Sequence, residues 1–413
     1  MLIKWLKDIE KGDFPLIGEK ASILSRLQES GIQVPHGFVL STQFYDLFLQ
    51  ETGLNLRLQE LKDIDKSDEE LLQEKIIEIQ ELIIEAEMPF SLKQHILEAY
   101  NNLNVNLDIY KLANKPTINM IKAGRDLPYV AVRTSLNNNS VFENPSTFLN
   151  VKGNNNTIST IQKCYASILT RNFVSDFNNL ANIKPAIIIQ KMVNSQVSGI
   201  ATTEESSIVI KAALGLAESI LTNTISSDYY TLNRNTFEIL NRTVNNQTIM
   251  LTKDDITGKT IKKIINDPRA YSQKLIDYDI LNIAKITSKI EPIFNSNVEL
   301  EFAIENSRIY IIQAKPLTNS SLNKPLIKED NTQTSNILED MPIITPDDII
   351  DSKDINDYYS KLEQSTPDEY KKNLPIKILT NDNEFSWIIK HDLDWDIVET
   401  VLRTIKEKWK QHN

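Results

Sequence analysis

The chain has 413 residues, of which 41% are hydrophobic and 24% are charged, and its formal net charge is -11. This composition is typical of a globular protein with room for two or three domains. The acidity argues against a nucleic-acid-binding surface, the single Cys164 excludes an intrachain disulfide, and no apolar run is long enough to span a membrane. Charged residues interrupt the N-terminal sequence before it could form the apolar core of a signal peptide. We therefore expect a cytoplasmic protein without nucleic-acid or membrane partners.

Residues 16–45 begin with a turn at Gly18, continue as a predicted helix and end in a short predicted strand. Lys20 follows the turn glycine by two residues, where its ammonium could reach a phosphate group. A lysine at the start of a helix is more often simply solvated, so these residues alone leave both interpretations open. From about 46 to 127 the apolar spacing predicts helices with a polar outer face, which we interpret as a helical insertion.

Two apolar strands are predicted in the middle of the chain. The segment YVAVR, residues 129–133, indicates a buried strand that ends in the cation of Arg133. The segment AIII, residues 186–189, leads into Gln190, Lys191, Met192 and Val193, a connector without alternation of polar and apolar side chains. This connector is either a hinge that forms the wall of a pocket or the end of an ordinary core strand.

Residues 298–316 show the alternation of two antiparallel strands around a polar break at residues 306–308. A three-residue loop there would place Glu301 opposite Gln313 and Glu299 opposite Lys315, about 5 Å apart at Cβ. A carboxylate and an amide oxygen at this separation can share a hard divalent cation, and a neighbouring ammonium can hold the phosphates that the cation bridges. A solvated outer face would carry a similar mixture of side chains, so spacing alone favours neither interpretation.

Taken together, these segments resemble the ATP-grasp domain, the AMP/ATP-binding N-terminal domain of the phosphoenolpyruvate synthase, pyruvate phosphate dikinase and rifampin phosphotransferase family. The resemblance covers about residues 16–318. It is carried by GEKA at 18–21, VAVR at 130–133, TFLNV at 147–151, QKMV at 190–193, ELEFAI at 299–304 and IYIIQAKP at 309–316.

The resemblance implies a two-lobed α+β fold with an N-terminal lobe at 1–190, including the helical insertion, and a C-terminal lobe at 191–318. It implies ATP and Mg²⁺ as ligands, with the metal on Glu301 and Gln313. Lys20, Arg133 and Lys315 take the phosphate-binding and catalytic positions. The remaining nucleotide contacts implied are Thr147, Phe148, Gln190, Met192 and Val193.

Several residues depart from the family pattern. Lys315 replaces an arginine, so it keeps the charge but loses the two-pronged contact of a guanidinium with phosphate. Lys211 replaces a glutamate, and Glu19 replaces a glycine beside Lys20. The loop before Thr147 is shorter than in the family, and Glu143 falls on one of its glycines.

The C-terminal part resembles no family known to us. Residues 319–340 indicate a polar linker, and 341–413 an acidic extension predicted to be mostly helical. None of the four histidines has the surroundings of the family's phosphohistidine, so we expect a partner protein to carry the phosphohistidine and acceptor-substrate domains. The resemblance therefore implies a phosphotransferase that passes a phosphoryl group from Mg-ATP to a histidine supplied in trans. The departures favour an alternative, a nucleotide-binding pseudoenzyme or regulatory subunit.

Overall fold

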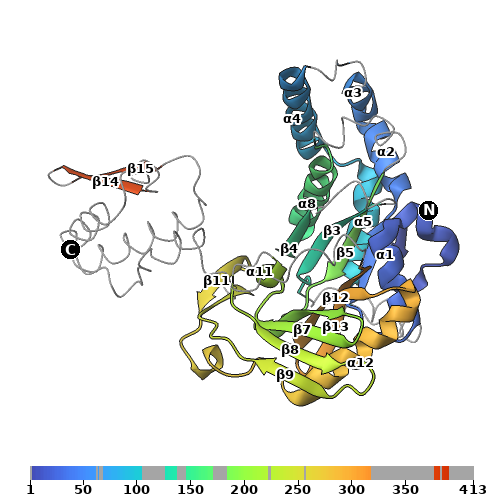
Figure 1. The fold of residues 1–413 in the computed structure, drawn as a ribbon. Helices are drawn as coiled ribbons and strands as arrows, with labels where there is room; N and C mark the ends of the chain where they lie inside the picture. The colour runs from blue at the N-terminus through green and yellow to red at the C-terminus, as the bar shows by residue number, and fades with distance from the viewer. Residues whose placement is uncertain are drawn as a thin grey trace. The chain divides into compact units, whose positions relative to one another are not determined.

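The computed structural model divides the chain into two compact units, residues 1–324 and 325–413 (Figure 1). The residues it describes are 2–61, 64, 68–104, 126–136, 146–170, 184–221, 225–254, 257–317, 376–381 and 384–389. No helix in these ranges is both long enough and apolar enough to cross a bilayer.

The first sheet of the larger unit has five antiparallel strands in the order β1-β2-β5-β3-β4. Its central strand β5 is buried along six of its seven residues, as the apolar run at 186–189 predicted. The strands are β1 (Ile3–Trp5), β2 (Gly37–Leu40), β3 (Val130–Leu136), β4 (Thr147–Val151) and β5 (Pro185–Lys191).

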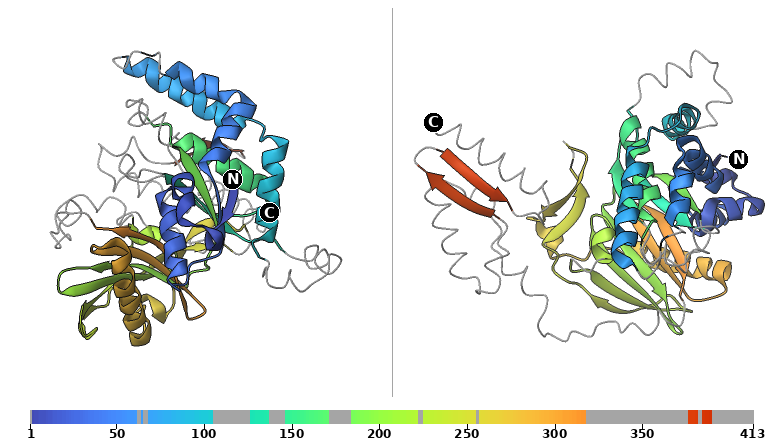
Figure 2. Two further views of the ribbon diagram at one scale, coloured as in Figure 1. Left: turned by 90° about the vertical axis from the view of Figure 1, so that its right-hand side faces the viewer. Right: turned by 90° about the horizontal axis from the view of Figure 1, so that it is seen from above.

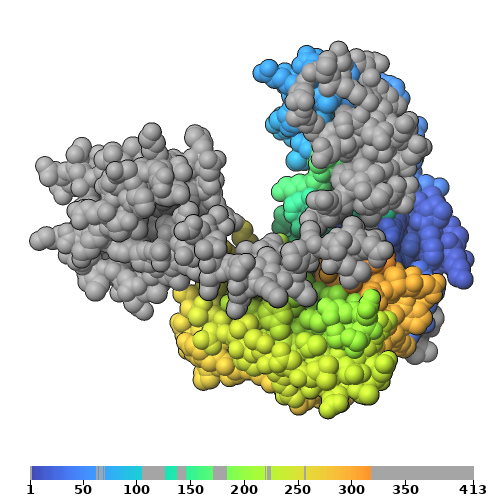
Figure 3. Space-filling view, in the orientation of Figure 1, coloured from blue at the N-terminus to red at the C-terminus, as the bar shows by residue number. Residues whose placement is uncertain are grey.

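Helices α2, α4, α5 and α8 cover one face of this sheet and form a first hydrophobic core with it. The helices expected between 46 and 127 are present in the described part of that range as α2 to α5. Their bounds, with α8, are α2 (Thr42–Thr52), α3 (Leu54–Glu60), α4 (Glu69–Glu85), α5 (Phe90–Asn102) and α8 (Asn154–Ser167). In the space-filling view the blue surface of this insertion stands at the top, apart from the green and yellow surface below (Figure 3).

The second sheet has six antiparallel strands in the order β13-β12-β6-β7-β8-β9. Helix α12 (Asp277–Phe294) packs along one face of it (Figure 2). The strands are β6 (Val197–Thr203), β7 (Ser207–Leu214), β8 (Asp228–Asn233), β9 (Ile239–Thr243), β12 (Val298–Glu305) and β13 (Arg308–Pro316). A separate ribbon is formed by β10 (Ile249–Lys253) and β11 (Thr260–Ile264), and a short helix α11 (Glu218–Leu221) follows β7.

Helix α1 (Phe14–Glu29) joins the two sheets. Its buried side chains, among them Ile17 and Leu24, share one hydrophobic core with Ile188 of the first sheet and Leu300 of the second. The two sheets therefore do not form independent cores, although the lobe boundary expected near residue 190 separates them in sequence. Sheets and helices together confirm the expected α+β fold.

Gly18 creates a sharp turn inside α1. Its φ of 74° and ψ of 170° lie in a region that is essentially restricted to glycine. A Cβ at this position would lie 2.5 Å from the backbone oxygen of Ser135 on β3. The same contact lets the Ser135 hydroxyl accept a hydrogen bond from the N–H of Ala21 at 3.1 Å. The glycine thus holds the start of α1, and with it Lys20, against the end of β3.

The structure corrects one prediction for the acidic extension. Residues 376–381 and 384–389 form two antiparallel strands, β14 (Ile376–Asn381) and β15 (Glu384–Ile389), and β15 includes the sequence FSWII, which we expected to begin a helix. The sequence FSWII within β15 has β-branched and aromatic residues that favour strands, and the helical spacing of the residues after it misled the prediction. The other residues of the extension lie outside the described ranges.

We predict that Gly18→Ala destabilises the protein more than Gly53→Ala. Gly53 also has a φ of 74°, but a Cβ there meets nothing within 4 Å, so it is a matched control for backbone strain alone. We expect Gly53→Ala to lower the free energy of unfolding by about 1 kcal/mol. We expect Gly18→Ala to lower it by about 3 kcal/mol, since collision adds to strain. Urea unfolding of both variants measures the difference, and equal losses would show that the approach to Ser135 is not a constraint.

Candidate functional site

The hairpin of β12 and β13 brings four polar residues into two cross-strand pairs. Glu301 lies opposite Gln313 and Glu299 opposite Lys315, which confirms the predicted register. The route to this register differs from the prediction, because the turn contains only Asn306 and Ser307, both at positive φ. A shorter turn alone would shift every pair by one residue.

A β-bulge restores the register. The pairing shifts between Glu301 and Phe302, so Ile312 has no partner in the ladder. The guanidinium of Arg133, from β3 of the first sheet, binds at this irregularity. It donates to the Ile312 carbonyl at 3.0 Å and to the Gln313 Oε1 at 2.5 Å. The bulge is therefore the point at which the second sheet binds the Arg133 guanidinium of the first sheet.

Arg133 is buried, with only 6% of its surface exposed, and it lies 3.9 Å from the Glu301 carboxylate. Burial lowers the pKa of its guanidinium, and Glu301 opposes that effect. Among the described residues its Nε–H has no hydrogen-bond acceptor. A buried donor without a partner is unfavourable, so the site is suited to an additional acceptor such as a phosphate oxygen.

Lys20 belongs to the same cluster. Burial and the positive charges of Arg133 and Lys315 together lower the pKa of its ammonium to about 8, and the Glu301 carboxylate opposes this shift. These influences show that three cations predicted from separate segments meet in one region. Arg133 and Lys315 repel the Lys20 ammonium and Glu301 offsets part of that repulsion, so a further anion bound here would stabilise the cluster.

Lys315 is about half exposed and forms an ion pair with Glu299 at 2.7 Å. Its assigned role on phosphate stays a prediction, because this contact directs its ammonium to a carboxylate of its own hairpin. An exposed pair of this kind is weak and can be exchanged for a phosphate contact.

Glu301 and Gln313 fit the ligand set of Mg²⁺ in their chemistry, because both supply hard oxygen atoms. Mg²⁺ commonly takes one or two protein ligands and completes its shell with water and substrate phosphates. The described residues contain no group of three or more His, Cys, Asp or Glu side chains that could hold a metal by themselves. A metal at this pair would thus depend on a phosphorylated ligand.

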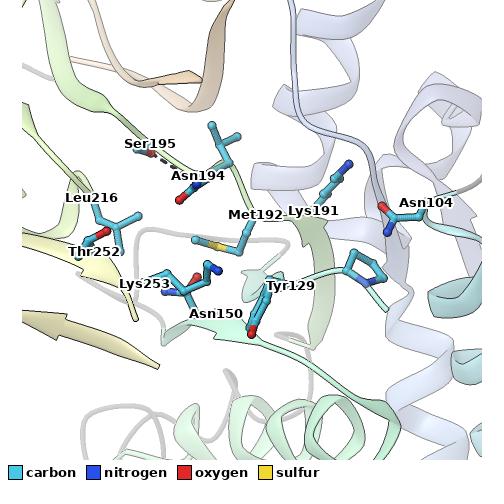
Figure 4. A pocket seen from close by; sticks show the side chains of 12 residues that line it. Asn104, Tyr129, Asn150, Lys191, Met192, Asn194, Ser195, Leu216, Thr252 and Lys253 are labelled. Carbon is cyan, nitrogen blue, oxygen red and sulfur yellow. Dashed lines mark hydrogen bonds between the residues drawn. The ribbon is translucent and has the colours of Figure 1, made fainter. Parts of the chain in front are cut away.

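A pocket of about 200 Å³ opens at the connector after β5 (Figure 4). The side chain of Met192 points into it, and Val193 lines it as well. The Met192 N–H donates to the Tyr129 carbonyl at 2.9 Å, whereas the Val193 N–H has no partner among the described residues. The pocket is lined by Asn104, Pro128, Tyr129, Asn150, Lys191, Met192, Val193, Asn194, Ser195, Leu216, Thr252 and Lys253.

Gln190, Thr147 and Phe148 lie at the border of these features. The buried Gln190 side chain donates to the Pro35 carbonyl at 3.1 Å, which ties β5 to the segment just before β2. Thr147 is exposed and pairs with Arg133 across the sheet, and Phe148 packs against the first core. Their roles as nucleotide contacts stay predictions, as do those of the other proposed site residues. Glu143 lies outside the described residues.

The sequence did not identify the part of the pocket that comes from Tyr129 and the β10–β11 ribbon. The ammonium groups of Lys152 and Lys253 lie 4.8 and 4.6 Å from the centre of the Tyr129 ring. Asn150, at positive φ, donates to the Thr260 hydroxyl on β11 at 2.8 Å. The aromatic residue before VAVR was the one available signal for this wall.

An α+β unit in which two sheets bring cations and oxygen-bearing side chains together, and in which a pocket opens at the connector after β5, has the architecture expected of a nucleotide-binding protein. Comparison with known families narrows this class. Residues 14–336 match the family described as pyruvate phosphate dikinase, AMP/ATP-binding domain, and the chain belongs to that family. The resemblance inferred from the motifs is thereby confirmed.

Curated relatives include probable phosphoenolpyruvate synthases. The protein of Methanocaldococcus jannaschii is 31% identical over 338 residues, which cover 78% of this chain and 27% of that protein. The protein of Methanothermobacter thermautotrophicus is 28% identical over 331 residues, covering 76% of this chain and 46% of that protein. This chain thus spans less than half the length of these relatives.

Among solved structures, the D-alanine–D-alanine ligase of Bacillus anthracis complexed with ATP is 11% identical. The match covers 50% of this chain and 46% of that one, with a TM-score of 0.21. This likeness is too slight to support an inference about the site.

We predict that Lys20→Met changes the pH dependence of stability. In the folded chain the Lys20 pKa is about 8, below its usual 10.5, so the folded state releases this proton first as pH rises. Its destabilising effect is full below pH 8 and disappears as pH rises through 10.5. The wild type should therefore gain stability relative to Lys20→Met between these values. Denaturant unfolding at pH 7, 8.5 and 10 measures this, and a constant difference would contradict the cationic cluster.

Proposed function

We propose that this chain binds Mg-ATP and passes a phosphoryl group from it to a histidine supplied in trans. The observation that carries the proposal is the meeting of Lys20, Arg133, Glu301 and Gln313 in one region. These residues come from three distant segments, and no local structural need explains a group of mutually repelling cations beside a hinge pocket.

In this proposal the hinge pocket holds the nucleobase. The Val193 N–H is the donor open to a base nitrogen, and the Met192 side chain provides an apolar wall. The strands of the second sheet lead from this pocket to the Glu301 level, where the phosphates lie. Arg133 donates its Nε–H to a phosphate oxygen, and Lys20 neutralises charge on the same group.

Phosphoryl transfer is mostly a matter of positioning and charge neutralisation. Mg²⁺, when bound, adds positive charge between phosphate oxygens, and Glu301 and Gln313 are the residues that would hold it. The bond from phosphorus to the bridging oxygen of ATP breaks, and a bond from phosphorus to the histidine nitrogen forms. The nucleotide leaves as ADP if one phosphorus is transferred and as AMP if a pyrophosphoryl group is transferred.

The histidine is proposed to belong to a partner protein that also carries the acceptor-substrate domain. Support comes from the sequence, because none of His36, His95, His391 and His412 has a phosphohistidine motif around it. Relatives named phosphoenolpyruvate synthase are more than twice as long as the matched region. Pyruvate is therefore the acceptor that we propose first.

A second candidate is a nucleotide-binding regulatory subunit without turnover. Two contacts favour it, since Arg133 donates to Gln313 and Lys315 forms an ion pair with Glu299. Cations that are already paired with side chains of the protein gain less stabilisation from binding a phosphate.

Calorimetry with Mg-ATP tests binding, and both candidates require it. Incubation of the chain with ATP and a histidine-domain partner then separates them, with ADP and AMP measured by chromatography. Formation of either product together with an acid-labile phosphohistidine supports the transferase. Binding without product in the presence of a partner that is phosphorylated by another enzyme of the family supports the regulatory subunit.

We predict that Glu301→Ala removes the gain in ATP affinity that Mg²⁺ provides. The carboxylate is the one charged ligand of the proposed metal pair. Loss of a group that merely orients a metal ligand weakens binding by about 10- to 100-fold, so loss of the ligand itself should weaken it at least that much. ATP binding without Mg²⁺ should persist, because Arg133 and Lys20 remain. Glu299→Ala is the matched control, since this glutamate lies on the same strand but pairs with Lys315. A metal-dependent gain retained in Glu301→Ala would refute the metal assignment.

We predict that Lys315→Arg preserves or improves Mg-ATP affinity, whereas Lys315→Ala weakens it several-fold. A guanidinium makes two parallel bonds to a phosphate, and an ammonium acts as a point charge. Titration calorimetry on the two variants and the parent measures this. Equal affinity in all three would show that the side chain stays on Glu299 and does not reach the phosphates.

A further inference from the structure

The second sheet carries a cation that the proposed site does not yet include. We define the central row as the cross-strand series Gln313, Glu301, Ile200, Lys211 and Tyr229. Each residue lies opposite the next in the antiparallel ladders of β13, β12, β6, β7 and β8. Residues paired in this way project from the same face of a sheet. The side chain of Lys211 therefore shares a face with the Glu301 carboxylate.

This face is the one that looks toward the first sheet. The neighbours of Lys211 on β7, Ile210 and Ala212, are fully buried in the core beneath α12, which fixes Lys211 on the opposite side. On that opposite side Glu301 lies 3.9 Å from Arg133 of the first sheet. The central row thus runs from the cationic cluster across the face of the second sheet that looks toward the first sheet.

Lys211 is half-buried, and its ammonium lies 5.3 Å from the centre of the Tyr229 ring. It forms no ion pair with any of the described residues. Two strand spacings separate it from Glu301, which is about 10 Å between backbones. A lysine side chain covers most of that distance, so the ammonium can reach a phosphate held at Glu301.

The contact with Tyr229 is suited to be the resting position of the Lys211 ammonium before a ligand binds. A cation over an aromatic ring at a partly exposed site is bound more weakly than a charge-assisted hydrogen bond to phosphate. The Tyr229 ring holds the Lys211 side chain extended along the face of the sheet, and the ammonium leaves the ring when an anion binds.

We propose that Lys211 is a further phosphate-binding residue, which contacts the terminal phosphate of the bound nucleoside triphosphate from a resting place on Tyr229. The inference rests on the proposed function, because it needs a triphosphate at the Glu301 level. It also predicts a specificity. With Lys211 as a fourth cation beside Lys20, Arg133 and Lys315, the site favours ligands with the full triphosphate chain over ligands with fewer phosphates.

The test is a set of calorimetric titrations with Mg-ATP, Mg-ADP and AMP on the wild type and Lys211→Met. Methionine keeps the length of the side chain and removes its charge. We expect the affinity for Mg-ATP to fall about tenfold, as for the loss of one charge-assisted contact. The affinity for AMP should stay within about twofold, since its phosphate lies nearer the pocket.

Matched controls separate the possible outcomes. Lys285→Met removes an exposed lysine from α12, on the far side of the sheet, and should change none of the three affinities. Tyr229→Phe keeps the ring and should keep the wild-type affinities, whereas Tyr229→Leu removes the resting contact of the free state and should leave Mg-ATP binding unchanged or make it slightly tighter. Thermal unfolding without ligand shows whether each variant is folded, and Lys211→Arg, which keeps the charge, should restore ATP affinity.

A wild type that does not bind Mg-ATP would refute the proposed function itself. A wild type that binds, with a Lys211→Met variant that binds Mg-ATP equally well, would refute this inference alone. Equal losses for ATP and AMP would likewise overturn it, because they would show a role in the fold or the pocket.

Discussion

The contact of Arg133 with the bulge of β13 is the interaction on which the site depends. It is made by a buried guanidinium from one sheet and by a backbone carbonyl and an amide oxygen from the other. A buried cation is strongly unfavourable without such partners, so the two sheets are held at the separation that satisfies it. The same geometry sets the distance from Arg133 to Glu301. One contact consequently positions Arg133 relative to Glu301 and Gln313, the pair that we propose to bind the metal.

The arrangement of the cores explains why this contact can be reliable. Helix α1 packs on both sheets, and its buried face belongs to the same hydrophobic core as β5 and β12. Lys20 is carried on this helix directly after the turn at Gly18. The lysine that we propose to bind phosphate is thus carried by the helix that joins the two sheets. Packing density in such a core resists small displacements, so the cluster is fixed rather than assembled on demand.

Sequence reasoning found the family, the cations and the cross-strand pairs, because each rests on local patterns of residue type. It could not find the bulge, since a two-residue turn with a bulge gives the same pairing of Glu301 with Gln313 as a three-residue loop. It did not anticipate that Glu299 would engage Lys315, because ion pairs depend on rotamers. The wall formed by Tyr129 and β10–β11 was missed for another reason, since it joins segments more than a hundred residues apart. In the extension, helical spacing after FSWII outweighed strand propensity and gave the wrong structure.

The lowered pKa of Lys20 has a consequence for the lifetime of the chain. Its causes are the burial of the ammonium and its repulsion from Arg133 and Lys315, which Glu301 only partly offsets, and Arg133 itself holds a buried donor without a partner among the described residues. That strain weakens the unliganded fold and disappears when a polyanion occupies the cluster, so occupancy and stability are linked. An empty chain opens more often and is cut by proteases more readily than a filled one. The abundance of this protein in a cell would then follow the supply of the anion that fills its site.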